Sequence, residues 1–208
     1  MRRLYFIRHT ESEANRKNIL ASQIDFSLSD SGKQQAETIA EAFSGAFSVD
    51  AVISSPLLRA YQTATFFTQK GRHRVFEKNA ALIEQHLGVF SGMSYEDLEK
   101  RSDFCHDRSQ RWNWIPDGGG ESYRMVAERV LSFFREIERR YATQSLLIVT
   151  HAVTMRLIRA VLENTLPAYP DEIPANGEIW EVLFQGIGFR HEIKMHRLAG
   201  IAPTGRRA

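Results

Sequence analysis

Short apolar runs alternate with amphipathic stretches along most of the chain. Residues 4–7 and 146–149 are unbroken apolar runs rich in branched and aromatic side chains, a pattern typical of strands buried on both faces of a sheet. Between them, the apolar side chains within 36–43 and 126–137 recur three and four residues apart, as they do on one face of a helix. This alternation predicts an α/β fold of three layers, α/β/α, around a mainly parallel central sheet.

The remaining pattern predicts further strands and the ends of helices. Runs of β-forming residues predict strands over 49–54, 74–77, 179–184 and 191–196. We expect Ser29 or Asp30 to cap the first long helix. Pro56 suits the first turn of the next helix, which Gly71 would end, and another helix is expected over 154–162.

The stretch 79–120 departs from this rhythm. It contains clustered aromatic residues, a short helix predicted near 95–100 and a glycine-rich exit. With 208 residues, the chain has the length of one domain with a large core. We therefore expect a single domain over 1–198 that carries 79–120 as an inserted lid subdomain, followed by a flexible tail over 199–208.

Composition and charge narrow the classes of partner. The 27 basic and 25 acidic residues give a formal charge of +2, too small to favour nucleic acid or a membrane surface as a partner. No stretch approaches the ~18 consecutive apolar residues of a membrane helix, and no hydrophobic signal segment follows Met1, so we expect a cytoplasmic protein. The single Cys105 excludes an intrachain disulfide and a cysteine-based zinc site. The oligomeric state stays open, a homodimer included.

Two histidines directly follow the two most apolar runs. His9 follows 4–7 and Arg8, and His151 follows 146–150. A parallel sheet places such residues at the carboxyl edge of its strands, where open α/β folds bind ligands. An imidazole there can be a nucleophile, Arg8 adds fixed positive charge, and a tight loop can return the amide of Asn15 to the same place. This combination suits the chemistry of phosphate.

Several motifs in one collinear order carry a resemblance to a known family. Residues 8–15 read Arg-His-Thr-Glu-Ser-Glu-Ala-Asn and resemble the Arg-His-Gly-Glu-Ser-x-x-Asn opening of the histidine phosphatase superfamily, which includes cofactor-dependent phosphoglycerate mutase and the fructose 2,6-bisphosphatase domain. Further matching segments are 28–36, 54–64, 84–88, 120–122 and 150–156. Such an ordered set is far more specific than Arg-His-x-Glu alone.

The resemblance implies an enzyme, a phosphomonoester hydrolase that needs neither metal nor cofactor and acts on a small phosphorylated metabolite through a phosphohistidine intermediate. His9 would be the nucleophile, Arg8 and Arg59 would clamp the phosphoryl oxygens, His151 would add contacts and Glu84 would be the general acid. The residues expected to bind substrate are Arg8, Asn15, Ala21, Ser22, Arg59, His86 and Ala152.

Departures from the family pattern favour hydrolysis over phosphoryl transfer. Thr10 stands where the family has glycine, and 21–23 read Ala-Ser-Gln where mutases have threonine, glycine and tryptophan. The chain also lacks the longer lid insertion of mutases. A cofactor-dependent phosphoglycerate mutase-type phosphotransferase stays open as an alternative. So does a non-catalytic module that binds a phosphorylated ligand or a protein, although such members usually lose one of the residues that are all present here.

Other histidines and aromatic residues have less defined expectations. His86 either lines the pocket or lies on the surface, and His106 is undecided. A surface position is expected for His73, His191 and His196. The aromatic residues of 79–120 cap the substrate or form a local core: Phe104, Trp112 and Trp114.

Overall fold

A six-stranded sheet in the order β3-β2-β4-β1-β5-β6 forms the centre of the computed structural model, which describes residues 1–71 and 75–198. The strands are β1 (Arg2–Arg8), β2 (Ala51–Ser54), β3 (Val75–Lys78), β4 (Leu146–Thr150), β5 (Ile179–Phe184) and β6 (Ile193–His196). Strands β1 to β4 pair in parallel, whereas β5 is antiparallel to β1 and β6 to β5. The mainly parallel sheet is confirmed. The predicted tail at 199–208 and the predicted surface position of His73 lie outside the described residues.

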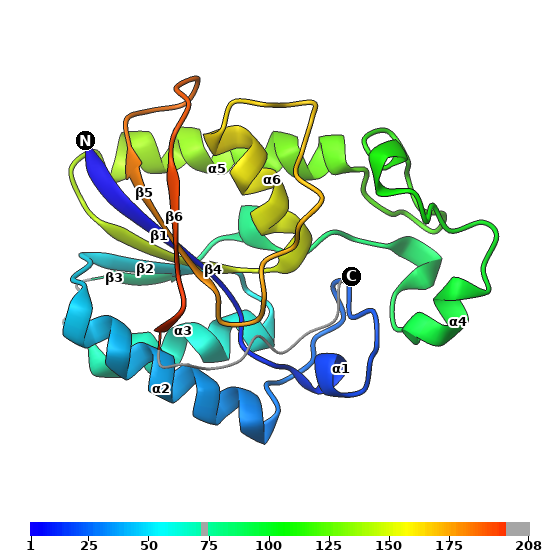
Figure 1. The fold of residues 1–208 in the computed structure, drawn as a ribbon, viewed down its shortest axis with the longest axis horizontal. Coiled ribbons are helices and arrows are strands. Elements are labelled where there is room, and N and C mark those ends of the chain that lie inside the picture. The colour runs from blue at the N-terminus through cyan, green and yellow to red at the C-terminus, as the bar shows by residue number, and fades with distance from the viewer. Residues whose placement is uncertain (72–74, 199–208) are drawn as a thin grey trace.

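Helices cover both faces of this sheet. The α-helices are α1 (Glu13–Arg16), α2 (Asp30–Ala46), α3 (Leu58–Lys70), α4 (Tyr95–Glu99), α5 (Tyr123–Arg140) and α6 (Ala152–Leu162). Three short 3₁₀ helices are η1 (Ala80–Leu82), η2 (Gly88–Phe90) and η3 (Arg108–Gln110). In Figure 1, α5 and α6 lie on one side of the sheet and α2 and α3 on the other. The three-layer arrangement predicted from the sequence is therefore confirmed.

Alternate residues of the central strands feed two separate cores. Leu4 and Phe6 of β1 pack with α5 and α6, whereas Tyr5 and Ile7 pack with α2 and α3. The helix that follows β1 thus covers one face of the sheet, and the helix that follows β4 covers the other. Two neighbouring parallel strands whose connections leave on opposite faces create a crevice at their carboxyl ends. Arg8 pairs with Thr150 at this point, so His9 and His151 both border the crevice.

Two details differ from the sequence predictions. Residue 56 is a proline that precedes α3 instead of opening it, because the extended Leu57 is the N-cap and donates its N–H to the Ser55 hydroxyl. His191 is 5% exposed, not on the surface. Its Nδ1 donates to the Leu162 carbonyl and its Nε2 accepts from the backbone N–H of Gln185, so it closes the gap between α6 and β5.

The stretch 79–120 contains a small core of its own. Leu87, Phe90, Leu98 and Phe104 pack together, and Trp114 covers them, with its ring centroid 5.3 Å from that of Phe104. Figure 1 shows this part, with α4, extending from one end of the sheet. Trp112 packs instead against the α5–α6 core. The aromatic residues of this stretch therefore have structural partners of their own.

Candidate active site

The two histidines that follow β1 and β4 lie next to each other at the carboxyl edge of the sheet. The backbone N–H of His9 donates to the Thr150 carbonyl at 2.9 Å, which extends the β1–β4 ladder beyond the strands. The ring centroids of His9 and His151 are 5.2 Å apart. The His9 residue is 4% exposed, and His151 is fully buried. The structure thus brings together the two histidines that the sequence places at strand ends.

The hydrogen bonding of His9 determines its tautomer. Its Nδ1 lies 2.7 Å from the carbonyl oxygen of Thr10, which can only accept, so Nδ1 carries the proton of the neutral ring. Nε2 then keeps a free lone pair. Burial, and next the charges of Arg59 and Arg8, hold the pKa of His9 well below its usual value of 6.5. His9 is therefore a neutral imidazole at neutral pH, as a nucleophile must be.

His151 is held from the neighbouring strand end. Its Nε2 lies 2.7 Å from the hydroxyl of Ser55, the residue that follows β2. Burial, and next the charges of Arg59 and His9, lower its pKa well below 6.5 as well. Its Nδ1 is buried and has no hydrogen-bond partner within the described part of the chain. Because buried polar atoms in proteins are nearly always paired, this atom is available to a ligand.

Arg8 and Arg59 bring two buried cations to the same place. The Arg8 Nη1 donates to the Pro174 carbonyl at 2.8 Å, and its buried Nε has no partner in the described residues. Arg59 donates from Nη2 to the Ser22 carbonyl at 2.7 Å and is 2% exposed.

No carboxylate forms an ion pair with either guanidinium within 1–71 and 75–198. Burial lowers the pKa of Arg59 to about 10, which leaves the group charged at neutral pH. The charge of Glu84 reaches both groups without forming an ion pair with either in the described residues. Buried cations without a paired carboxylate are costly unless an anion binds them, and the fork of a guanidinium matches phosphoryl oxygens.

Glu84 approaches the site from the stretch after η1. Its Oε2 accepts from the N–H of Val153 and its Oε1 from the N–H of Thr154, both at 3.3 Å. These donors lie in the first turn of α6, immediately after His151. The carboxyl group is therefore held beside the histidine pair by the start of a helix.

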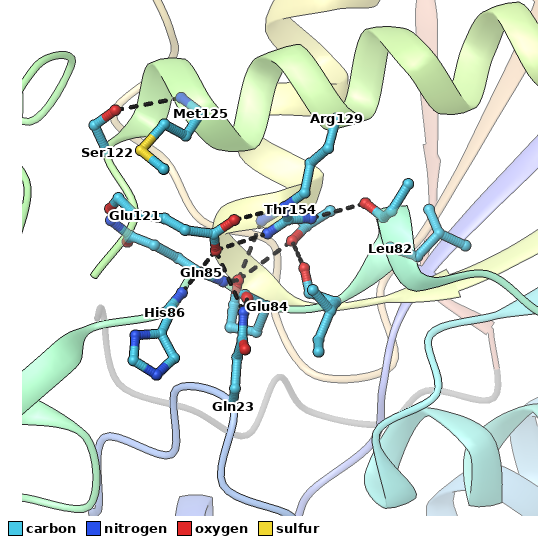
Figure 2. A network of polar contacts seen from close by, with 12 residues as sticks. Gln23, Leu82, Glu84, Gln85, His86, Glu121, Ser122, Met125, Arg129 and Thr154 are labelled. Atoms are coloured by element: carbon cyan, nitrogen blue, oxygen red, sulfur yellow. Dashed lines mark hydrogen bonds and ion pairs between the residues drawn. The ribbon is translucent and has the colours of Figure 1, made fainter. Parts of the chain in front are cut away.

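A polar network behind Glu84 holds the segment that carries it (Figure 2). Glu121 forms an ion pair with Arg129, with Nε and Oε1 3.1 Å apart. The other oxygen of Glu121 accepts from the side chain of Gln23 at 3.3 Å and from the backbone N–H of His86 at 2.8 Å. The Gln85 amide donates to the Glu121 carbonyl at 2.7 Å. The general acid expected from the sequence thus has a rigid support.

Asn15 and Asn176 form a second polar support on the side of β1. The Oδ1 of Asn15 accepts from the Ser12 N–H in a capping box at the start of α1, where the sequence suggests only a loop. It also lies 3.4 Å from the Nδ2 of Asn176. This same Nδ2 donates to the backbone carbonyl of His9 at 2.8 Å. Because Asn15 accepts through its oxygen, its own amide group is left to donate to a ligand.

A cavity of about 60 Å³ opens among these groups. His9, Glu84 and all the residues expected to bind substrate except His86 line it: Arg8, Asn15, Ala21, Ser22, Arg59 and Ala152. His151 is not among the lining residues, and its buried ring lies behind the cavity, next to that of His9. The structure places His86 outside the cavity, where its Nδ1 accepts from the Gly88 N–H. The Ser22 hydroxyl is engaged by the protein, since it donates to the Gln85 carbonyl.

Sequence reasoning missed other residues of the site, among them Gln85, Tyr95 and Asn176. Tyr95 and Gln85 line the cavity, and Asn176 holds His9 and Asn15. Gln85 belongs to the matching segment 84–88, and Tyr95 opens the short helix predicted near 95–100, so both lie within stretches that the sequence singles out. Asn176 stands in a turn before β5 and has no comparable local signal.

The described residues offer neither a metal site nor a membrane-spanning helix. Within the described residues, no group of three or more His, Cys, Asp or Glu side chains is arranged to hold a metal ion. None of the helices in 1–71 and 75–198 combines the length and the apolar character needed to cross a bilayer.

Comparison with known proteins gives one family and several relatives. Residues 4–193 match the family model described as histidine phosphatase superfamily (branch 1). Phosphoserine phosphatase 1 of Hydrogenobacter thermophilus is 33% identical over 168 residues, which cover 78% of this chain and 76% of that protein. The 2,3-bisphosphoglycerate-dependent phosphoglycerate mutase of Parvibaculum lavamentivorans is 31% identical over 170 residues, which cover 77% of this chain and 80% of the mutase.

Solved structures share the fold. A mycobacterial glucosyl-3-phosphoglycerate phosphatase, in complex with VO3, superposes with a TM-score of 0.81 at 22% sequence identity. The match covers 96% of this chain and 100% of the other.

Proposed function

The chain belongs to the histidine phosphatase superfamily, and from that premise we propose that it hydrolyses a phosphomonoester of a small metabolite, without a metal, through a phosphohistidine. One observation carries the proposal. A neutral histidine with a free Nε2 lone pair lines a cavity that it shares with two buried arginines, and neither arginine has a carboxylate partner in the described residues. Such a site is suited to a phosphoryl group and to attack on its phosphorus.

The reaction has two balanced steps. In the first, Nε2 of His9 attacks phosphorus, the ester P–O bond breaks, and Glu84 gives its proton to the leaving oxygen. In the second, Glu84 takes a proton from water as the water oxygen attacks phosphorus and the Nε2–P bond breaks, which releases inorganic phosphate and returns the electron pair to Nε2 of neutral His9. Arg8 and Arg59 offset the charge on the phosphoryl oxygens, while His151 and Asn15 add hydrogen bonds.

Hydrolysis and phosphoryl transfer share the first step, and a mutase is the second candidate because one relative of 31% identity is a phosphoglycerate mutase. The Ala-Ser-Gln sequence at 21–23 favours hydrolysis, since the Ser22 hydroxyl serves the Gln85 carbonyl and not a substrate. The relative named phosphoserine phosphatase supports the same choice. Two further predictions concern the lid and the compartment. We predict that 79–120 acts as a lid and that the protein works in the cytoplasm.

The decisive experiment measures inorganic phosphate release from a panel of phosphorylated metabolites in the presence of EDTA. The panel includes O-phosphoserine, and 3-phosphoglycerate with and without its bisphosphate primer. Wild type is compared with His9→Ala, and with Lys33→Ala as a control, since Lys33 forms only an exposed ion pair with Asp30. We expect release by wild type and the control alone. Primer-dependent isomerisation without release would assign the chain to the mutases, and equal release by His9→Ala would refute the mechanism.

A further inference from the structure

A second, larger cavity continues from the catalytic one. It has a volume of about 180 Å³, against about 60 Å³ for the first. The two cavities share five lining residues: Leu20, Gln85, Leu87, Tyr95 and Val153. A phosphoryl group bound at His9 therefore has its ester oxygen within reach of this outer cavity, and whatever the oxygen carries must extend into it.

The walls of the outer cavity are mostly apolar. Leu87, Leu98 and Phe104, which belong to the small core of 79–120, line it together with Val153 and Ile173. A leaving group of hydroxyl-rich sugar or of bare serine would leave these walls in contact with water. An apolar body would bury them, with a gain of about 25 cal/mol per Å² of apolar surface removed from water.

Positive charge lines one part of this cavity. Arg108 and Arg111 contribute to its wall, and the guanidinium of Arg108 forms no hydrogen bond or ion pair with any described residue. Burial, and next the charges of Arg156 and Arg111, lower the pKa of Arg108, so it is partly desolvated among like charges. Arg111 is held in place, since its Nε donates to the Cys105 carbonyl at 2.8 Å and its guanidinium lies 4.8 Å from the Phe104 ring centroid.

Behind this wall, Arg156 increases the unbalanced charge. It is fully buried, its Nη1 donates to the Tyr123 hydroxyl at 2.8 Å, and its buried Nε has no partner in the described part of the chain. The acidic groups near this cluster are Glu99 in the cavity wall, Asp107, which the charge of Arg111 reaches, and Asp171, whose charge favours the Arg108 cation. None of the three forms an ion pair with Arg108, Arg111 or Arg156 within the described residues. A cluster of this kind is complete only when an anion binds it.

On the basis of the proposed function, we propose that the substrate is a phosphomonoester whose leaving group has an apolar body and a carboxylate, and that Arg108 binds this carboxylate in the outer cavity. A guanidinium fork meets both oxygens of a carboxylate. Glu99 in the same wall disfavours a doubly charged second phosphate. Arg8 and Arg59 thus serve the phosphoryl group, whereas Arg108 and Arg111 select the leaving group.

Two aryl phosphates of nearly equal leaving-group acidity test this proposal. One is the phosphate ester of 3-(4-hydroxyphenyl)propanoate, and the other is its neutral propanamide analogue. We expect wild type to prefer the carboxylate over the amide by about tenfold or more in kcat/KM, the range of a charge-assisted hydrogen bond. Arg108→Gln removes the charge and should abolish the preference, mainly by raising KM for the carboxylate ester, with hydrolysis of the amide unchanged.

The control variant is Arg124→Gln, which removes an arginine whose side chain is 58% exposed and, among the described residues, pairs with Glu128 alone. It should keep the full preference. Thermal unfolding of each variant separates a loss of fold from a loss of selectivity. Equal kcat/KM for the two esters in wild type, or an unchanged preference in Arg108→Gln, would overturn the inference while leaving the proposed function intact. Failure of wild type to release phosphate from either ester and from 4-nitrophenyl phosphate would overturn both.

Discussion

The sheet edge and the 79–120 stretch form two walls of one cleft, but they are built in different ways. At the edge, strand register and backbone hydrogen bonds hold the functional groups, as when the His9 N–H donates to Thr150. In 79–120, side chains hold the wall, through the small core around Phe104 and the contact of Arg111 with that ring. Backbone ladders tolerate little displacement, whereas a small side-chain core can be repacked. We therefore expect the chemistry to depend on the edge and on Glu84, whose carboxyl group the first turn of α6 holds there, and substrate selection to depend on the part of 79–120 that contains the small core.

The largest effect that would support this division is expected at Glu84. Glu84→Gln keeps the acceptor for the Val153 N–H but has no acidic proton to donate. We expect turnover of an alkyl phosphate to fall by about 10²–10⁴-fold, and that of 4-nitrophenyl phosphate to fall much less, because nitrophenolate leaves without a proton. Steady-state kinetics on both esters provide the test. Equal losses would show that Glu84 is not the acid.

A smaller effect is expected at Asn176, which contacts the edge from outside the motifs. Asn176→Ala removes the donor to the His9 carbonyl and the neighbour of Asn15. We expect kcat to fall by about tenfold while KM changes little, in the range of one lost buried hydrogen bond.

Asn176→Ser keeps a shorter donor and should restore part of the rate. In Asn176→Ala, phosphoenzyme formation measured by rapid quench should slow in parallel with kcat. A change confined to KM would show that Asn176 contributes to substrate binding and does not position His9.

Buried neutral histidines make the edge sensitive to pH. The pKa values of His9 and His151 lie well below 6.5 in the folded chain, whereas unfolded histidine titrates near 6.5. As the pH falls below about 6.5, the unfolded chain therefore binds protons that the folded chain does not. The free energy of unfolding should fall by up to about 1.4 kcal/mol per pH unit for each histidine, and this contribution should vanish above that range.

Urea unfolding at pH 7.5, 6.5 and 5.5 checks this expectation. His151→Gln should show a shallower decrease than wild type. His106→Gln, which removes an exposed imidazole that contacts the Arg101 carbonyl, should follow wild type. The same depressed pKa of His9 should keep the acidic limb of kcat/KM below pH 6.5. Identical slopes in all three proteins would indicate that the buried rings titrate normally.

The smallest effect on the chemistry is expected in 79–120. Phe104→Leu replaces a ring in the small core with a side chain that can repack. We expect turnover of 4-nitrophenyl phosphate to stay within about threefold of wild type. Discrimination between the carboxylate and amide esters should weaken, because Arg111 loses the ring beneath it. A large loss with 4-nitrophenyl phosphate would show that the small core also supports the catalytic groups.

The same division explains how much the sequence predicts. His9 and His151 follow apolar strand runs, and the parallel pairing of those strands brings them together, so local pattern is enough. The role of Ser29 as the N-cap of α2 follows from local sequence in the same way. Asn176 was missed because its position depends on how β5 pairs with β1, which no local pattern encodes.

Errors arose where tertiary contacts override local character. His191 lies among Phe189, Arg190 and Glu192, a sequence typical of a surface, yet it is buried because its ring bonds the end of α6. The placing of Tyr95 beside the catalytic cavity depends on the packing of α4. The shape of the outer cavity arises from that same packing, and therefore could not be predicted.

The support of His9 by Thr150 and Asn176 has a consequence for synthesis on the ribosome. The residue that attacks phosphorus is among the first to be made, but the groups that hold its backbone are made about 140 and 167 residues later, as the spacing of these contacts requires. Domains complete only after their distant contacts emerge. A nascent or truncated chain that ends between residues 157 and 175 therefore contains every sequence motif that matches the family and yet lacks the Asn176 donor to the His9 carbonyl.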